Sequence, residues 1–398
     1  MEEINIIMDL KCYSGRRASL SESSLFILAY IFVLTDFFFF FPEGYRLTGL
    51  FYYITISFAV LFALLSQITY SGIINKVFFW SSFGILFFVL GFRDVSGIDD
   101  ATYREIFENV NRNGVIATFL FSTMEPGYLV LNYLVGSLTD NYYLFQILCT
   151  FIPLFLFYKG FEKYRNYISI PWAVLLLIST LYFQMLAVSL VRLFIAVGII
   201  FYFLDTLWTC KTRKYIFIVF LAASIHYSAL IMGMFVILTF HEKILFRYWK
   251  KLILGAVLFL PFIFMGVSRF AASSMGDRYL RYTEVSGFSL SLGALDTLPF
   301  LLFSLFYKRL IPPVKRGFYL VAVVMLAMSS VCALFSTMVP LGRVIFYMNL
   351  SLLLLLPAVI RYARNGWFKT GVGCLIIVYA ILYLFVTQFL NESQMENL

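Results

Sequence analysis

The stretch from Leu186 to Thr206 reads LAVSLVRLFIAVGIIFYFLDT, an apolar run with a single arginine, Arg192, inside it. A helix of about 20 such residues, rising 1.5 Å per residue, crosses the roughly 30 Å hydrocarbon core of a bilayer. The rest of the chain has the same character, because 62% of its 398 residues are hydrophobic and its mean hydropathy is +0.90. So little polar surface cannot cover a soluble globule, and we predict an integral membrane protein.

Comparable apolar runs recur along the whole chain, with no linker that would separate soluble domains. We therefore predict one integral domain over residues 1–398, an all-α polytopic membrane protein with about 11 to 13 transmembrane helices. The first run follows a basic stretch without a small-residue cleavage pattern, so we expect it to stay as a span. The predicted spans are 24–41, 48–66, 77–92, 143–158, 168–184, 186–206, 252–268, 291–307, 318–338, 344–360 and 371–389.

Orientation depends on one ambiguous apolar segment, residues 215–240. If it enters and leaves the membrane on the same side, the cytoplasmic loops hold most of the 30 Lys and Arg residues, as the positive-inside rule favours. If it crosses once, the two sides hold nearly equal numbers. The segment is too short for two full spans, so we predict a re-entrant or broken hairpin. Its turn is expected at Ala222–Ser228, with His226 at the tip.

Polar residues gather on the predicted outer side. A charged island, GFRDVSGIDDATYR at Gly91–Arg104, opens an outer loop of about 93–142. A second outer loop, about 269–290, carries Arg278 and Arg281 and is either an amphipathic lid over substrate or a helix that contacts lipid headgroups. Helix depths place Arg192 and His226 in the outer half of the membrane. Ionisable groups at such depth are costly, and they commonly mark a functional site.

Each of these residues also has a purely structural interpretation. Arg192 and Arg343 could extend their side chains to the interface as anchors. His226 could satisfy the backbone of the hairpin, and Asp99 and Asp100 could cap a helix over 101–110. The five cysteines show no metal or disulfide spacing. The net charge of +9 is dispersed over short loops, which favours anionic lipid and excludes a continuous nucleic-acid surface.

Several spaced elements between about Gly91 and Tyr347 resemble a known family. The elements FRDVSGIDDATYREIF, MEPGYLVL, LVRLFIAVGI, KYIFIVFLAASIHYSALI and GRVIFYM are similar to those of the EpsG and Wzy-type polysaccharide polymerases of bacteria. The resemblance implies the glycosyltransferase architecture called GT-C. It also implies a protein of the bacterial inner membrane that joins oligosaccharide repeat units carried on undecaprenyl diphosphate, at the outer face.

The family pattern carries over to particular residues of this chain. Ile98 departs from it, where a threonine is more usual, at the loss of one hydrogen bond and no charge. The matching positions are Arg93, Gly97, Asp99, Tyr103, Glu125, Pro126, Arg192 and His226.

The expected chemistry needs a grip on diphosphate and a base or orienting acceptor for the attacking hydroxyl. Arginine binds diphosphate bidentately and keeps its charge, so Arg192, Arg343 and Arg93 are the candidates for stabilising the leaving group. Tyr103, Arg278 and Arg281 are further candidates for binding it. Asp99, Glu125 or His226 could act on the hydroxyl, with Glu125 and His226 ranked slightly ahead.

No metal or cofactor is expected, since the arginines supply the positive charge that a divalent ion would bring. Expected partners are the lipid-linked oligosaccharide, membrane lipid, a chain-length regulator and a flippase. A lipid-linked oligosaccharide flippase or an O-antigen ligase remains an alternative function. The polar island at Arg93 has no counterpart in the second half, and transporters usually show such an internal repeat.

Overall fold

The computed structural model describes most of the chain beyond residue 45. The described ranges are 46–69, 72–92, 99–122, 124–180, 190–237, 248, 251, 254–255, 292–306, 316–334, 339–363 and 366–395. Within these ranges all regular secondary structure is helical, which confirms the all-α prediction. The predicted spans 24–41 and 252–268 and the second outer loop lie outside the described residues, apart from two positions in 252–268.

Five described helical segments are long and apolar enough to cross a membrane. They coincide with predicted spans, which confirms a membrane protein. The total of about 11 to 13 spans and the GT-C architecture stay predictions. The five segments are Gly72–Gly91, Tyr142–Tyr164, Val191–Trp208, Arg316–Ala333 and Arg343–Tyr362.

The chain forms two compact units, and it passes between them at residues 89–90, 160–161, 180–181 and 355–356. In the unit that contains both termini, α8 contacts α3 and α19. Ser169, just before α8, donates a hydrogen bond to the side-chain oxygen of Gln67 on α3 (3.1 Å). The helices of this unit are α3 (Arg46–Ile68), most of α4 (Gly72–Gly91), α8 (Ile170–Ser179), the second half of α18 (Leu350–Tyr362) and α19 (Gly366–Met395).

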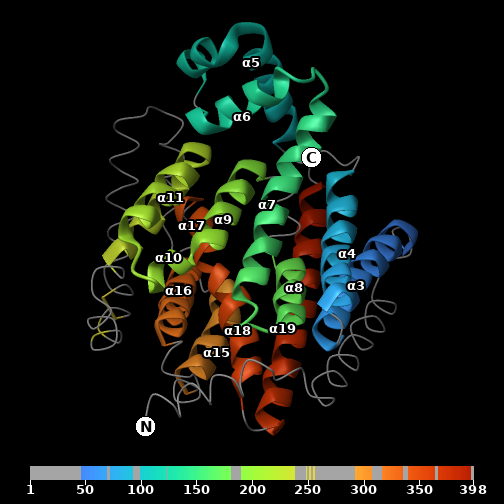
Figure 1. Cartoon of the computed structure of the whole chain (residues 1–398), viewed down its shortest axis with the longest axis vertical. Coiled ribbons are helices and arrows are strands. Elements are labelled where there is room, and N and C mark those ends of the chain that lie inside the picture. Colours follow the sequence, from blue (N-terminus) through green and yellow to red (C-terminus); the bar gives the residue numbers. More distant parts are fainter. Residues whose placement is uncertain are drawn as a thin grey trace. The chain divides into compact units, whose positions relative to one another are not determined.

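The other unit holds every described residue of the predicted site. Its helices form a group in which α5 and α6 lie across the ends of α7, α9 and α11 (Figure 1). They are α5 (Asp100–Phe121), α6 (Pro126–Gly136), most of α7 (Tyr142–Tyr164), α9 (Val191–Phe203), α10 (Asp205–Trp208), α11 (Thr212–Ile225), η3 (Tyr227–Phe235), α15 (Leu292–Phe306), α16 (Arg316–Leu334), α17 (Val339–Met348) and the first half of α18.

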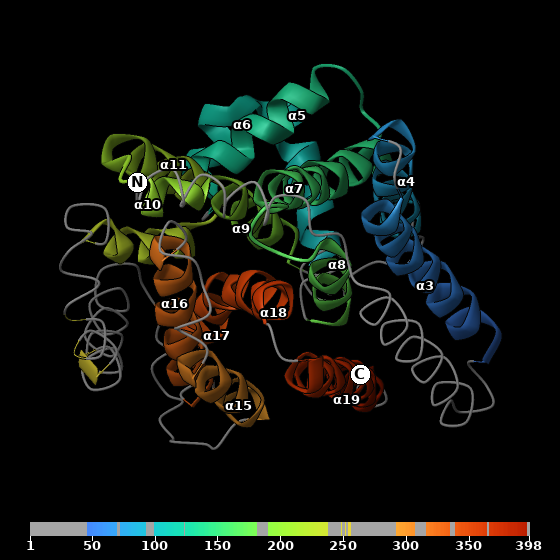
Figure 2. The same cartoon turned by 60° about the horizontal axis from the view of Figure 1, so that its bottom comes forward.

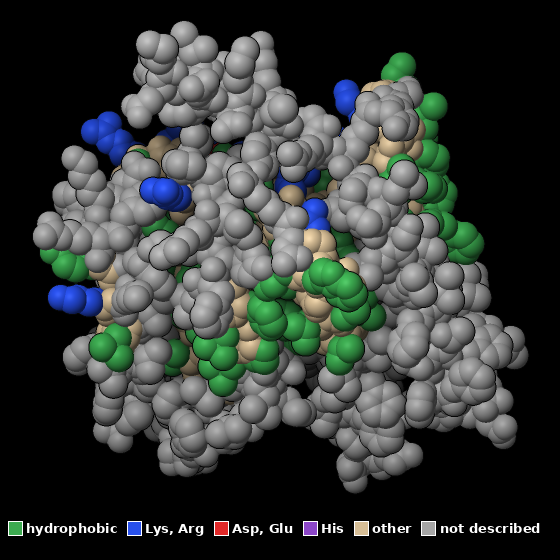
Figure 3. Space-filling model, turned by 90° about the horizontal axis from the view of Figure 1, so that it is seen from below, with side chains coloured by type: hydrophobic (Ala, Val, Ile, Leu, Met, Phe, Trp, Pro, Cys, Tyr) green, Lys and Arg blue, Asp and Glu red, His purple; other side chains and the backbone are tan. Residues whose placement is uncertain are grey.

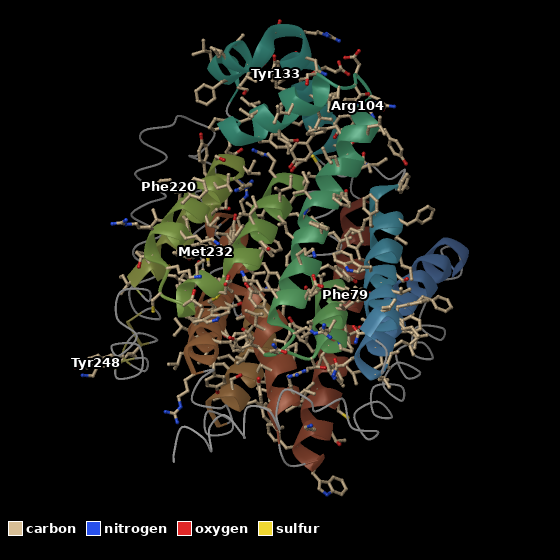
Figure 4. The ribbon with its side chains drawn as sticks, viewed as in Figure 1. Phe79, Arg104, Tyr133, Phe220, Met232 and Tyr248 are labelled. Atoms are coloured by element: carbon tan, nitrogen blue, oxygen red, sulfur yellow. The ribbon has the colours of Figure 1, made fainter. Side chains whose placement is uncertain are left out.

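The predicted loop 93–142 is largely a pair of packed helices, α5 and α6. Gly114 bends α5 with a φ of 79°, a conformation that glycine adopts without strain. The two helices bury an aromatic cluster that includes Phe107, Tyr128 and Phe145. At the start of α7, Tyr142 donates a hydrogen bond to Asp100 (2.7 Å), and Arg104 lies 5.1 Å from the Tyr142 ring centroid (Figure 4). These contacts hold the helix pair on α7.

The segment predicted as a hairpin contains a helix, a break and a 3-10 helix. α11 ends at Ile225, His226 is extended, and η3 starts at Tyr227. Tyr215 near the start of α11 donates a hydrogen bond to the carbonyl of Met232 on η3 (2.6 Å; Figure 4), so the two legs lie side by side. The chain therefore reverses at His226, inside the range expected for the turn.

The carboxyl-terminal helices of this unit bring Arg343 into the same group. α16 packs on α15 and on α17, as Figure 2 shows, and α17 in turn contacts η3 and α9. Ser329 of α16 donates a hydrogen bond to the buried Asn349, which lies between α17 and α18. Such an interhelical bond satisfies polar groups that would be costly in an apolar interior.

Candidate functional site

Arg192 lies in the first turn of α9, where the helix dipole disfavours a positive charge. Its guanidinium pairs with the carboxylate of Glu125, and the two side chains are 16% and 6% exposed. It also lies 5.6 Å from the ring centroid of Tyr103 and 5.7 Å from that of Tyr128. Cation–π contact of this kind contributes about 0.5–2 kcal/mol. The pair and the two rings therefore compensate for burying the charge.

The predicted helix start of this run is corrected by the structure. Leu190 has φ −111° and ψ 52°, so α9 begins at Val191 and not at Leu186. Arg192 consequently lies in the first turn of a helix and not about two turns inside one. Residues 181–189, which complete the predicted run, lie outside the described residues.

Glu125 is held at the N-cap position of α6 by the residues that follow it. Pro126 suits the first helical position, because its fixed φ is helical and its missing N–H needs no partner there. The Glu125 side chain makes no capping bond and turns instead to Arg192. Its other oxygen accepts a hydrogen bond from the backbone N–H of Tyr227 (3.2 Å). Glu125 thus connects α6, α9 and η3.

Gly127 allows the start of α6 to lie directly on α11. A Cβ at this position would lie 2.7 Å from the backbone oxygen of Ser224 and closer still to the Ser224 side chain. Since a backbone oxygen cannot rotate away, any side chain at Gly127 would push α6 off α11. In the sequence EPG, the proline starts α6 directly after Glu125, and the glycine lets α6 pack closely on α11. Together they position Glu125.

Gly127→Ala is accordingly expected to destabilise the protein by about 1–3 kcal/mol, as overpacking typically does. Thermal unfolding of the purified protein in detergent measures this loss. The matched control is Gly84→Ala in α4, where an added Cβ meets nothing within 4 Å. Equal melting temperatures for the two variants would contradict the close contact.

Two tyrosines form the walls around Arg192. Tyr103 is hydrogen-bonded to Arg192, and the rings of Tyr103 and Tyr128 meet edge to face at 5.8 Å. Burial raises the pKa of Tyr103 above its usual value, although Arg192 opposes the shift. Burial raises the pKa of Tyr128 well above its usual value. Both phenols therefore stay protonated and available as hydrogen-bond donors.

His226, Ser228 and Tyr347 form a second polar group on the other side of Glu125. His226 Nδ1 accepts a hydrogen bond from the Ser228 backbone N–H (3.2 Å) and lies 2.8 Å from Ser228 Oγ. Ser228 Oγ is hydrogen-bonded to the hydroxyl of Tyr347 on α17 (3.2 Å). Sequence reasoning missed Ser228 and Tyr347. Both lie within the sequence elements that resemble the family. Ser228 follows His226 by two residues and Tyr347 follows Arg343 by four, and this proximity could have indicated them as site residues.

Arg343 lies on the same face of α17 as Tyr347, one helical turn earlier. Arg343 and Arg192 both act electrostatically on His226. Two guanidinium groups from α17 and α9 therefore lie near one imidazole, which creates a positive region next to the Glu125 carboxylate. Such a region suits an anionic ligand.

Asp99 and Asp100, at the start of α5, have different environments. Asp99 occupies the N-cap position without a side-chain capping bond, and its carboxylate acts electrostatically on Tyr103. Asp100 binds Tyr142. The structure thus brings together the predicted residues Asp99, Tyr103, Glu125, Arg192, His226 and Arg343. Arg93, Arg278 and Arg281 lie outside the described residues. Among those the structure describes, no three His, Cys, Asp or Glu side chains group as metal ligands would.

A match to one protein family agrees with this set of residues. The model of the EpsG family matches residues 76–396, most of the chain. The chain belongs to the EpsG family. No curated protein and no solved structure matches it. Membership confirms the resemblance stated above, and it indicates a polysaccharide polymerase-type role in a membrane.

The EpsG match runs from the first turns of α4 to the end of α19, and every element that forms the site lies within it. Asp99, Glu125, Arg192, His226 and Arg343 all lie within the matched range. The geometry adds what the family match does not contain, namely which of these side chains contact each other.

Proposed function

We propose that this EpsG-family protein is a polymerase that joins undecaprenyl-diphosphate-linked oligosaccharide repeat units into O-antigen or a related surface polysaccharide. The observation that carries the proposal is the convergence of Arg192, Arg343, His226 and Asp99 from helices far apart in the sequence. Guanidinium groups beside a carboxylate and an imidazole are the residue types that a diphosphate leaving group and a sugar hydroxyl require.

The leaving diphosphate would bind to the arginines. Arg192 Nε is buried and has no hydrogen-bond partner among the described residues, although the guanidinium already binds Glu125. A buried N–H without a partner is costly, and a phosphate oxygen would satisfy it. Arg343 adds a second positive charge near His226. The transition state would gain most from these charges as the diphosphate departs.

The acceptor hydroxyl needs a base or an orienting acceptor, and the geometry favours Asp99. Both Glu125 oxygens already accept hydrogen bonds, from Arg192 and from Tyr227 N–H. If Glu125 took up a proton as the base, the buried Arg192 would lose its negatively charged partner. Asp99 makes no capping bond and lies near Tyr103, which borders Arg192. This order reverses the one that sequence alone suggested.

The site is proposed to lie on the outer face of the inner membrane. The first turn of α11 contains Arg213 and Lys214 and follows Lys211, whereas the helix ends at Ile225 next to His226, so its basic end and its site end are opposite. The charged side chains coloured in the view from below are Lys or Arg (Figure 3). The positive-inside rule assigns the basic start of α11 to the cytoplasm.

Labelling with a membrane-impermeant thiol reagent tests this orientation. In a cysteine-free background, Glu242→Cys and Lys250→Cys are expected to react only after the membrane is permeabilised. Glu105→Cys, on the exposed face of α5, is the matched control and is expected to react in intact cells. The opposite pattern would overturn the orientation and the outer-face site together.

Reconstitution in liposomes with a defined undecaprenyl-diphosphate-linked repeat unit tests the function directly. A polymerase produces a ladder of polymer lengths. Transfer of one unit to a lipid A core acceptor, without a ladder, would indicate a ligase. Movement of the substrate across the bilayer without a new glycosidic bond would indicate a flippase. Either of these last two results would refute the proposal.

The reaction is proposed to be independent of metal, since arginines can stabilise the leaving diphosphate. Polymer synthesis in the reconstituted system is expected to be unchanged after exhaustive treatment with EDTA. Loss of the ladder, with recovery on adding Mg²⁺ or Mn²⁺, would show that a divalent ion takes part. A buffer exchange without chelator serves as the control.

A further inference from the structure

His226 is held by a chain of hydrogen bonds that crosses from the hairpin to α17. The imidazole is 5% exposed, and Tyr347 is fully buried. Nδ1 accepts from the Ser228 backbone N–H, and Ser228 Oγ lies between Nδ1 and the Tyr347 hydroxyl, at 2.8 Å and 3.2 Å. His226 is also the N-cap residue of η3, so its ring position is tied to the start of that helix.

This geometry determines which ring nitrogen carries the proton. A backbone N–H can only donate, so the nitrogen that accepts from it has no proton. In a neutral imidazole the proton is then on Nε2. Arg192 from α9 and Arg343 from α17 both repel a positive charge on the ring, while Glu125 is already occupied by Arg192 and Tyr227. These surroundings disfavour a doubly protonated ring.

We infer that the Ser228 backbone N–H holds His226 as the Nε2–H tautomer, with the Ser228 and Tyr347 hydroxyls positioning the ring, so that His226 donates a hydrogen bond to a phosphate oxygen of the leaving diphosphate and does not act as the base. The inference rests on the proposed function for the identity of the ligand. No proton is transferred: the N–H bond persists, and the developing oxyanion gains one donor. Diphosphate oxygens are acceptors only, which matches a neutral donor beside two arginines.

The tautomer can be measured without any activity assay. The chain has only two histidines, so ¹⁵N-histidine labelling gives four ring-nitrogen signals, and His241→Gln assigns those of His226. We expect a protonated Nε2 and an unprotonated Nδ1 between about pH 6 and 8. Ser228→Ala keeps the backbone N–H and is therefore expected to keep this tautomer, with a shifted Nδ1 signal because the Oγ contact is lost, and Ser228→Thr is expected to restore the wild-type signal. A protonated Nδ1 or an imidazolium ion in the wild-type protein would overturn the inference.

Activity of paired variants tests the role of the proton. His226→Ala is expected to lower kcat about 10²–10³-fold, the usual effect of losing one donor to a developing oxyanion. The glutamine amide can place an N–H near the Nε2 position, and the asparagine amide near Nδ1, so His226→Gln should recover part of kcat and His226→Asn should not. The acid limb of the pH–rate profile is expected to be the same in His226→Gln and wild type. A glutamine variant as inactive as alanine would refute the donor role.

Positioning by the neighbours has its own readout. Ser228→Ala and Tyr347→Phe are expected to lower kcat about tenfold, with little change in KM for the lipid-linked donor, and Ser228→Thr is expected to restore it. If these variants do not accumulate in the membrane, the ¹⁵N-histidine spectrum of the wild-type protein decides the inference. If the wild-type protein makes no polymer, the proposed function fails, whereas the tautomer assignment stands or falls on the spectrum alone.

Discussion

Glu125→Ala is expected to abolish polymer synthesis and to lower the amount of folded protein in the membrane. The substitution leaves the Arg192 guanidinium, 16% exposed, without its carboxylate, and Tyr227 N–H without its acceptor. Removing one partner of a buried ion pair typically costs about 3–5 kcal/mol, because the remaining charge is uncompensated. Quantitative immunoblotting of membranes and thermal unfolding in detergent measure this loss.

A double variant separates the structural effect from the catalytic one. Replacing a whole buried ion pair with apolar residues of similar volume is often neutral for stability. Glu125→Met combined with Arg192→Met is therefore expected to recover most of the folded protein, because only the bond from Tyr227 N–H to Glu125 is still lost, but not the polymer. If the Glu125→Ala protein were present in normal amount and fully active, the Glu125–Arg192 pair would have neither a structural nor a catalytic role. A double variant that makes polymer would show that Arg192 does not bind the diphosphate.

Asp99→Asn is expected to lower turnover by about 10²–10⁴-fold, the contribution of a positioned general base, with normal amounts of protein. The asparagine keeps the size of the side chain and removes its ability to take a proton. Asp99→Glu is expected to restore part of the activity. Polymer yield per molecule of purified protein in liposomes measures the effect.

The neighbouring carboxylate is the matched control. Asp100 accepts a hydrogen bond from Tyr142, and Asp100→Asn keeps an acceptor oxygen for that bond. Asp100→Asn is expected to change the free energy of unfolding by no more than about 0.5 kcal/mol. Its turnover is expected to stay near that of the wild type. Equal losses in Asp99→Asn and Asp100→Asn would point to a general weakening of α5. Wild-type turnover in Asp99→Asn would exclude Asp99 as the base.

Hydropathy was sufficient to predict the five apolar helical segments that are long enough to span the membrane. It was less reliable at helix ends. The run that contains Arg192 has no proline or glycine near Leu190, yet α9 begins only at Val191. Apolarity shows that a segment belongs in lipid, but it does not indicate where the backbone leaves helical geometry. The segment expected as an outer loop is mostly α5 and α6, because their packing on α7 buries an aromatic face.

The candidate residues were identified from the sequence, but their contacts were not. Glu125 and Arg192 are 67 positions apart, and Ser228 and Tyr347 are 119 apart. Nothing in either local pattern indicates that these side chains meet. The contact between Glu125 and Tyr227 N–H also changed the ranking of the possible bases, because it showed that the carboxylate is already engaged.

The sequence by itself determined the membrane class, the helical fold, the EpsG family and the set of polar residues that a diphosphate-linked reaction needs. Those properties depend on composition and on residues close together in the chain, since apolar length alone decides whether a segment is stable in lipid. Only the tertiary structure decided that Glu125 pairs with Arg192, that Asp99 makes no capping bond, and that Ser228 lies between His226 and Tyr347. These features depend on distances of a few ångströms between helices, where a hydrogen bond forms or fails.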